Sequence, residues 1–132
     1  MANKYILDAC ALIAFMQQES GFEVIRNILI DAGDNKATVH MNKLNLFEVF
    51  YGVRRAEGFA QAENVYNRVL RLPITIIDGI SDDVFLEASR IKSSYKMSLA
   101  DSIALGEASI MGASLVTSDH HEFDAVEKNE AI

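Results

Sequence analysis

Short apolar runs alternate along this chain with segments of helical periodicity, and this alternation restricts the possible folds more than any other feature. Four runs have the length and composition of buried strands: residues 4–8, 37–41, 74–78 and 113–119. Helical patterns fill the intervals, at residues 11–20, 21–33, 42–57, 59–71 and 81–95 and from residue 98 onward. Strands and helices in this order are typical of an α/β fold with a mainly parallel sheet, which we expect to have four to five strands.

The composition indicates a single domain spanning residues 1–132. Half of the residues are hydrophobic, which is enough to form a packed core. The single cysteine, Cys10, excludes an internal disulfide and fits a reducing compartment. Asp8 interrupts the apolar start, and no apolar run reaches the roughly 20 residues that span a bilayer. We therefore expect a soluble, cytoplasmic protein that does not enter a membrane.

The charge balance limits the kind of partner. The chain has 12 basic and 19 acidic residues, a net charge of -7. A large non-specific nucleic-acid surface is normally basic, so this balance argues against one. It leaves room for a site bridged by metal ions or for a basic protein partner.

Three of the acidic residues stand out by their position. Asp8 and Asp119 follow apolar runs at the carboxyl ends of predicted strands, which is the edge where open α/β sheets bind ligands. Asp101 lies within the apolar helical run that starts at Ser98. A carboxylate in such surroundings is costly unless it is paired or caps the helix. Asp78 also ends a predicted strand, but the following Gly79 indicates an ordinary turn.

A fourth acid, Glu48, lies in the predicted helix 42–57. Leu44, Phe47 and Tyr51 form an apolar stripe on this helix, which we expect to be buried, and Glu48 borders that stripe. Asn45 is one turn away and shares the side of Glu48, so it is a candidate supporting residue.

Carboxylates that gather at one place repel each other. Two of them about 5 Å apart repel by roughly 3 kcal/mol at an effective dielectric constant near 20, whereas a whole domain is stable by only about 5–15 kcal/mol. A hard divalent cation removes this cost, and Mg²⁺ and Mn²⁺ prefer oxygen ligands. The acids therefore predict a magnesium site in which manganese can substitute.

Each acid also has an ordinary structural interpretation. Ser98 followed by Asp101 is close to a helix-capping box, and aspartates at strand ends often begin turns. A lone glutamate such as Glu48 more often lies on a solvated helix face. The adjacent His120 and His121 lack the spacing of a zinc site.

Together, the acidic motifs resemble those of the PIN domain, the nuclease fold of VapC-type bacterial toxins. The resemblance covers nearly the whole chain, and its motifs appear in the expected order: YILDACALIAF, LNLFEVFYG, MSLADSIALGEA and LVTSDHHEFD. It implies a three-layer α/β/α PIN-like fold. It also implies a Mg²⁺- or Mn²⁺-dependent endoribonuclease whose catalytic, metal-holding residues are those four acids: Asp8, Glu48, Asp101 and Asp119. Thr117 would be a supporting hydroxyl.

The resemblance also implies partners, which are an RNA substrate, a basic antitoxin that blocks the site, and a second copy in a homodimer. Many relatives carry Thr and Ser directly after the first acid, where this chain has Ala9 and Cys10. The alternative function is therefore a PIN-like module that binds RNA or a protein without cleaving. A haloacid-dehalogenase-type phosphatase would need an aspartate at Cys10, and a receiver domain would need an acidic pair that Ala9 breaks. Both are disfavoured.

Overall fold

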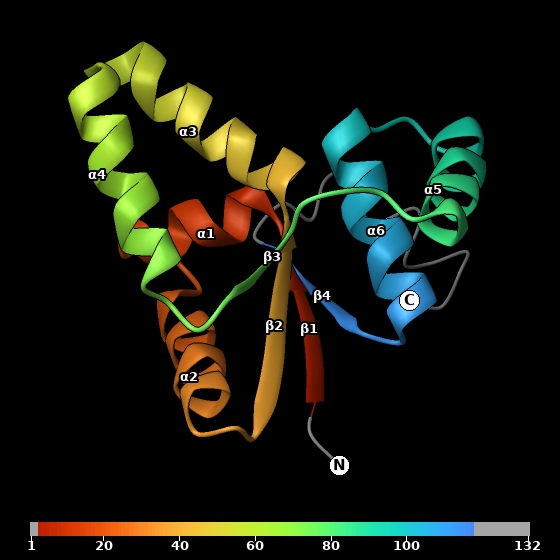
Figure 1. Cartoon of the computed structure of the whole chain (residues 1–132), viewed down its shortest axis with the longest axis horizontal. Helices are drawn as coiled ribbons and strands as arrows, with labels where there is room; N and C mark the ends of the chain where they lie inside the picture. The colour runs from red at the N-terminus through yellow and green to blue at the C-terminus, as the bar shows by residue number, and fades with distance from the viewer. Residues whose placement is uncertain (1–2, 118–132) are drawn as a thin grey trace.

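The computed structural model describes residues 3–117, which form one α/β unit (Figure 1). Its elements follow each other as the alternation predicts: β1 (Asn3–Leu7), α1 (Ala9–Met16), α2 (Phe22–Gly33), β2 (Ala37–Asn42), α3 (Lys43–Glu57), α4 (Phe59–Leu70), β3 (Thr75–Ile77), α5 (Asp82–Ser94), α6 (Leu99–Met111) and β4 (Ser114–Val116). The predicted last strand, 113–119, extends past residue 117, so its end, including Asp119, lies outside the described residues.

Within residues 3–117, the strands form a four-stranded sheet in the order β3-β2-β1-β4. Every pairing is parallel, with Ile6 opposite His40 on one side and opposite Leu115 on the other. The first three strands are added in one direction, and the chain then crosses from β3 at one edge to β4 at the other. The predicted parallel α/β sheet is thus confirmed.

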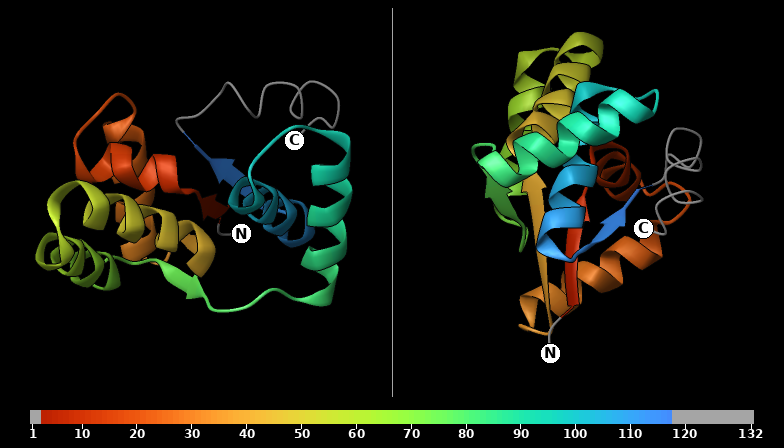
Figure 2. Two further views of the ribbon diagram at one scale, coloured as in Figure 1. Left: turned by 90° about the horizontal axis from the view of Figure 1, so that it is seen from above. Right: turned by 90° about the vertical axis from the view of Figure 1, so that its right-hand side faces the viewer.

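Helices cover the two faces of the sheet in separate groups (Figures 1 and 2). Leu7, Val39 and Met41 point into one core together with apolar side chains of α1, α2, α3 and α4. On the other face, Ile6 packs against Ala104 and Ala108 of α6. This is the three-layer α/β/α arrangement that the resemblance implied.

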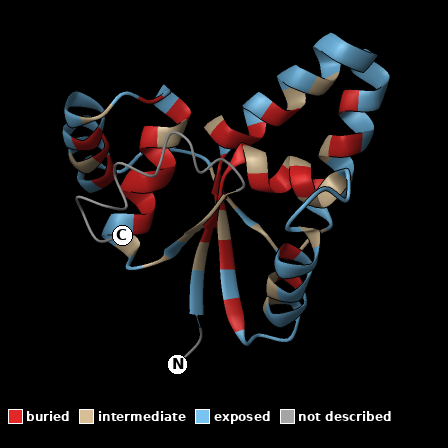
Figure 3. Ribbon diagram, turned by 180° about the vertical axis from the view of Figure 1, so that it is seen from behind, coloured by how far each residue is buried: buried red, intermediate tan, exposed pale blue. Residues whose placement is uncertain are grey.

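Burial increases toward the carboxyl ends of the central strands (Figure 3). β1 begins exposed at Asn3 and ends at Ile6 and Leu7, which are both fully buried. Helices pack around this end of the sheet from both sides, and Asp8, which follows β1, is buried there. No helix within residues 3–117 has both the length and the apolar character needed to cross a membrane.

The first helix differs from its prediction at both ends. Residues 11–20 were expected to be helical, but α1 starts at Ala9 and stops at Met16. It starts early because the Asp8 side chain accepts a hydrogen bond from the Ala11 amide and so caps the helix directly after the strand. It stops early because Gln18 adopts a positive φ of 53°, which a right-handed helix does not allow.

The helices α5 and α6 pack closely where they cross at Gly106. A Cβ atom built on Gly106 would lie 3.1 Å from both the Cβ and the backbone nitrogen of Ala88. Real Cβ atoms rarely come this close, so glycine is what lets the two backbones approach each other.

We predict that Gly106→Ala destabilises the protein by about 1–3 kcal/mol, because the added methyl group forces α5 and α6 apart. Gly52→Ala is the matched control, since Gly52 lies within α3 and has no atom within 4 Å of its built Cβ. That change should stabilise by about 0.5–1 kcal/mol through its helix propensity. Urea denaturation measures both, and equal responses would contradict the tight α5–α6 contact.

Candidate functional site

The sheet has a switch point between β1 and β4, because the strands before and after this point are added in opposite directions. Ligands of open α/β sheets bind at such a point, beyond the carboxyl ends of the strands. The Asp8 amide continues the ladder and donates to the Val116 carbonyl at 3.3 Å. Because Leu7 pairs with Val116, Asp8 and Thr117 follow their strands side by side at the switch point.

Asp8 is buried at this position, with 1% of its surface exposed. Its Oδ1 accepts from the Ala11 amide at 2.8 Å, so the carboxylate lies at the amino end of α1. The partial positive charge of a helix amino end stabilises a carboxylate there. The helix therefore fixes the orientation of the Asp8 side chain and lowers the cost of burying it.

Asp101 lies in the first turn of α6 and is half-buried. The capping interpretation of this segment is confirmed for Ser98, whose Oγ accepts from the Asp101 amide at 3.1 Å. The cap uses the backbone of Asp101. The carboxylate is thus placed at a second helix amino end, where a negative charge is again favoured.

The α3 helix presents Glu48 and Asn45 in different environments. Glu48 is exposed, whereas Asn45 is fully buried and donates from Nδ2 to the Ala100 carbonyl at 3.4 Å. Asn45 therefore ties α3 to the residue directly before Asp101. This contact explains why an amide occupies a core position on the helix.

The predicted burial of the apolar stripe on α3 is wrong. Phe47 and Tyr51 are 62% and 49% exposed, and their rings stack with centroids 6.1 Å apart. The buried positions of α3 are Asn45, Leu46 and Val49 instead. The prediction failed because α3 packs through a face rotated from the aromatic one, which is left exposed.

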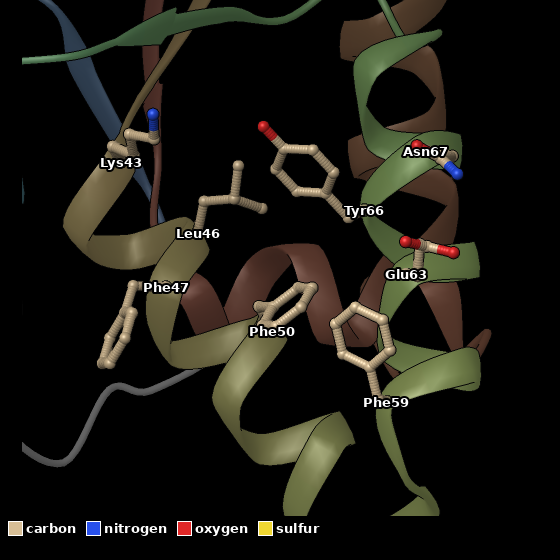
Figure 4. Close-up of a pocket in the computed structure, with 8 residues that line it drawn as sticks. All are labelled: Lys43, Leu46, Phe47, Phe50, Phe59, Glu63, Tyr66 and Asn67. Atoms are coloured by element: carbon tan, nitrogen blue, oxygen red, sulfur yellow. The ribbon is translucent and has the colours of Figure 1, made fainter.

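On α3, Lys43, Leu46, Phe47 and Phe50 form one wall of a groove with α4 (Figure 4). The groove has a volume of about 440 Å³ and a mainly apolar lining, in which Phe50 meets Phe59 and Tyr66 edge to face at 6.2 and 6.0 Å. Lys43 and Glu63 supply charges at its border (Figure 4). This groove was not predicted from the sequence.

The elements bring the predicted residues together only in part. Asp8 and Thr117 meet at the switch point, and Asn45 binds next to Asp101. Among residues 3–117, no three His, Cys, Asp or Glu side chains are grouped in a way that could hold a metal ion. The fourth predicted ligand, Asp119, falls beyond the described part of the chain. Asp78 is exposed and forms a surface ion pair with Lys43 at 3.5 Å, which agrees with its interpretation as a turn residue.

A buried polar pair that was not predicted from the sequence consists of Asn42 and Glu107. Glu107 of α6 is 2% exposed, and its Oε2 accepts from Asn42 Nδ2 at 3.0 Å. Asn42 Nδ2 also donates to the Gly79 carbonyl at 3.0 Å, while its Oδ1 caps α3 by accepting from the Leu44 amide at 2.9 Å. The available signal was a second acid in the same apolar run as Asp101.

Burial raises the pKa of the Glu107 carboxyl above its ordinary value, and the hydrogen bond from Asn42 offsets part of that rise. On the neighbouring α5, hydrogen bonds from Arg90 and Ser109 lower the pKa of Glu87. The pKa values of these two glutamates are thus shifted in opposite directions from the ordinary value.

Comparison with known proteins identifies one family. The sequence model of the PIN domain matches residues 5–129. Comparison with curated proteins finds no matching sequence.

Several solved structures share the fold. VapBC2 from Rickettsia felis, solved bound to a DNA fragment from its promoter, superimposes with a TM-score of 0.73 at 18% identity, covering 93% of this chain and 92% of that one. DNA-bound VapBC from Salmonella typhimurium superimposes with a TM-score of 0.69 at 17% identity, covering 92% of this chain and 91% of that one. Mycobacterium tuberculosis VapC20 is described as a toxin that cleaves the sarcin-ricin loop. It superimposes with a TM-score of 0.68 at 12% identity, covering 92% of this chain and 94% of that one.

We predict that Glu107→Gln stabilises the protein more as the pH rises. The folded protein holds the Glu107 proton more tightly than the unfolded chain does, so the wild type loses stability as the pH rises from about 4.5 through the higher folded pKa. The stability difference between Glu107→Gln and wild type should grow across that range and then level off. Urea denaturation at a series of pH values measures it.

Glu87→Gln is the control for this titration. Because the folded pKa of Glu87 is lowered, its contribution to stability is complete above about pH 4.5 and is lost only as the pH falls below that value. Its stability difference from wild type should be constant above pH 4.5. A constant difference for Glu107→Gln as well would refute the burial effect.

Proposed function

Because the chain belongs to the PIN domain family, we propose that it is a divalent-metal-dependent endoribonuclease and the toxin of a toxin–antitoxin pair. The observation that carries this proposal is the buried carboxylate of Asp8 at the switch point of the sheet. The cap on α1 engages Oδ1 of this carboxylate, and a bound cation would compensate the rest of its buried negative charge.

Asp8, Glu48, Asp101 and Asp119 would hold Mg²⁺ or Mn²⁺. Their chemistry fits this group, since carboxylate oxygens are the ligands that hard divalent cations prefer. The burial of Asp8 fits as well, because a cation compensates a negative charge that water cannot reach. When bound, the ion activates a water molecule and stabilises charge on the leaving oxygen.

The chain's own residues hold the carboxylates in place. The α1 amino end orients Asp8, and the Ser98 cap fixes the backbone of Asp101 in the first turn of α6. Asn45 links the helix of Glu48 to the residue before Asp101, and we assign it a supporting role. Thr117, which follows β4 beside Asp8, would add a hydroxyl for orienting the substrate.

The overall charge bears on which partners the chain attracts. At a net charge of -7, the chain as a whole repels the phosphates of RNA, and a cation held by the acids would reduce this repulsion locally. The same charge favours a basic partner protein. We propose an antitoxin of this kind, since the similar structures from Rickettsia felis and Salmonella typhimurium are VapBC proteins bound to DNA.

The exposed apolar surface supports a protein partner. Phe47 and Phe59 are each more than half exposed and line the same groove between α3 and α4, and contiguous exposed apolar surface is typical of protein interaction sites. We accordingly propose that the protein acts in the cytoplasm, forms a homodimer and binds an antitoxin.

A non-cleaving module that binds RNA or a protein is the second candidate. It is favoured by Ala9 and Cys10, which supply no hydroxyl next to Asp8, and by the exposure of Glu48. A cleavage assay separates the two candidates.

We predict that the purified protein cleaves RNA with Mg²⁺ or Mn²⁺ and stops when a chelator is added. Asp8→Asn should lower the cleavage rate by about 100-fold or more, since even the loss of outer-shell partners of a metal site costs about 10–100-fold. Asparagine caps helices as well as aspartate does, so this variant should fold. Activity is measured on a mixture of RNAs.

Asp78→Asn is the matched control, because Asp78 also follows a strand but is exposed at the far edge of the sheet. It should cleave at the wild-type rate. Cleavage that survives the chelator or Asp8→Asn would refute the metal mechanism. A wild type that binds Mn²⁺ without cleaving RNA would favour the second candidate.

We predict that Mg²⁺ and Mn²⁺ raise the Tm of the wild type. An ion at about 100 times its Kd stabilises the folded state by about 2.7 kcal/mol. Asp8→Asn should lose this shift and Asp78→Asn should keep it. Thermal unfolding with and without each ion measures the effect, and an unchanged wild-type Tm would count against a metal site.

A further inference from the structure

The burial of Glu107 carries a cost in folding free energy. It is 2% exposed in a helix whose neighbouring buried residues are Ala104, Leu105 and Ala108. Its Oε2 accepts from Asn42, but its buried Oε1 has no hydrogen-bond partner among the described residues. An apolar side chain of the same size would avoid this desolvation. Stability alone does not explain why an acid stands here.

Asn42 gives Glu107 its connection to the rest of the fold. It is the last residue of β2 and the N-cap of α3. Its side chain binds the Leu44 amide, the Gly79 carbonyl and Glu107, so it joins α3, the segment after β3, and α6. Because Asn42 is itself 2% exposed, these hydrogen bonds form away from water, where each is strong and each lost partner is costly.

A second hydrogen bond joins the same two helices. Asn45, one turn into α3, donates to Ala100 at the start of α6. The Asn42–Glu107 and Asn45–Ala100 contacts thus hold α3 against α6 at two separate points along α6. Two attachments restrict both the distance and the rotation between helices, which one attachment would not.

These two helices carry two of the proposed metal ligands, Glu48 on α3 and Asp101 on α6. We propose that Glu107 and Asn42 are positioning residues, which fix α3 relative to α6 and thereby hold Glu48 and Asp101 in register for a divalent cation. This inference rests on the proposed function. Neither residue is a ligand or touches substrate in this assignment.

The test compares three variants and one control variant by Mn²⁺ affinity, thermal stability and hydrogen exchange. Glu107→Met removes the hydrogen bond and fills the space with a flexible apolar side chain. We expect its Tm without metal to be unchanged or higher than that of wild type. Its Kd for Mn²⁺, measured by calorimetry, should rise roughly 10- to 100-fold, the usual effect of losing an outer-shell partner of a metal site.

Glu107→Gln keeps an oxygen that accepts from Asn42, so it should bind Mn²⁺ within a few-fold of wild type. Asn42→Ser keeps the N-cap, since serine caps helices as well as asparagine does, but loses both donated hydrogen bonds. It should weaken Mn²⁺ binding as Glu107→Met does. Hydrogen exchange of the metal-free proteins adds a readout without the ion, and amides in the first turns of α3 and α6 should exchange faster in both weakened variants.

Glu87→Met is the matched control. Glu87 also ties a helix to α6, because it accepts from Ser109 at 2.6 Å, but it does so from α5, at the end of α6 away from Asp101. Its Mn²⁺ affinity should equal that of wild type.

The inference would be overturned if Glu107→Met bound Mn²⁺ with the same affinity as the wild type. It would also be overturned if Glu107→Gln lost as much Mn²⁺ affinity as Glu107→Met. If the loss of Mn²⁺ affinity in Glu107→Met disappears once the unfolded fraction is corrected for, the role of Glu107 is purely structural, and the inference is also overturned. A wild type that shows no Mn²⁺ binding overturns the proposed function and this inference together. The first three outcomes, with an active wild type, overturn the positioning role alone.

Discussion

The fold depends on the burial of β1 between two hydrophobic cores. Leu7 faces the core built with α1 to α4, Ile6 faces α6, and both are fully buried. A strand packed on both faces and paired on both edges cannot shift its register without moving apolar side chains out of a core. The residue that follows it is therefore held as firmly as the strand. That residue is Asp8, so a strand that is buried on both faces positions a buried carboxylate.

The acids of this protein are tolerated by different local means. Asp8 caps α1, Asp101 stands in the first turn of α6, Glu48 is exposed to water, and Glu107 receives a hydrogen bond from Asn42. Mutual repulsion is thus not the only constraint on their placement, because helix ends and an amide already offset part of the cost. A cation would act on carboxylates that the fold has placed beforehand, which limits the rearrangement needed on binding.

The order of elements and the parallel sheet could be predicted from the sequence because apolar runs and helical periodicity are local signals. The capping role of Ser98 was equally visible, since a cap depends on a few adjacent residues. The orientation of α3 was not predictable in this way. Its aromatic residues look like a buried stripe, but the helix buries Asn45, and that choice depends on Ala100, which is 55 residues away in the chain. The pair of Asn42 and Glu107 was missed for the same reason, since 65 positions separate its members.

The crossing from β3 to β4 has a consequence for the newly made chain. β1 is synthesised well before β4, so one of its two edges has no neighbour until Ser114–Val116 have been made. Until then, the strand that carries Asp8 presents open backbone groups, and the crevice beside it has only one wall. A chain that stops before this point would be left with an unpaired central strand, which is a target for proteases and for aggregation. The protein thus acquires both walls of its candidate site only once β4 has been made.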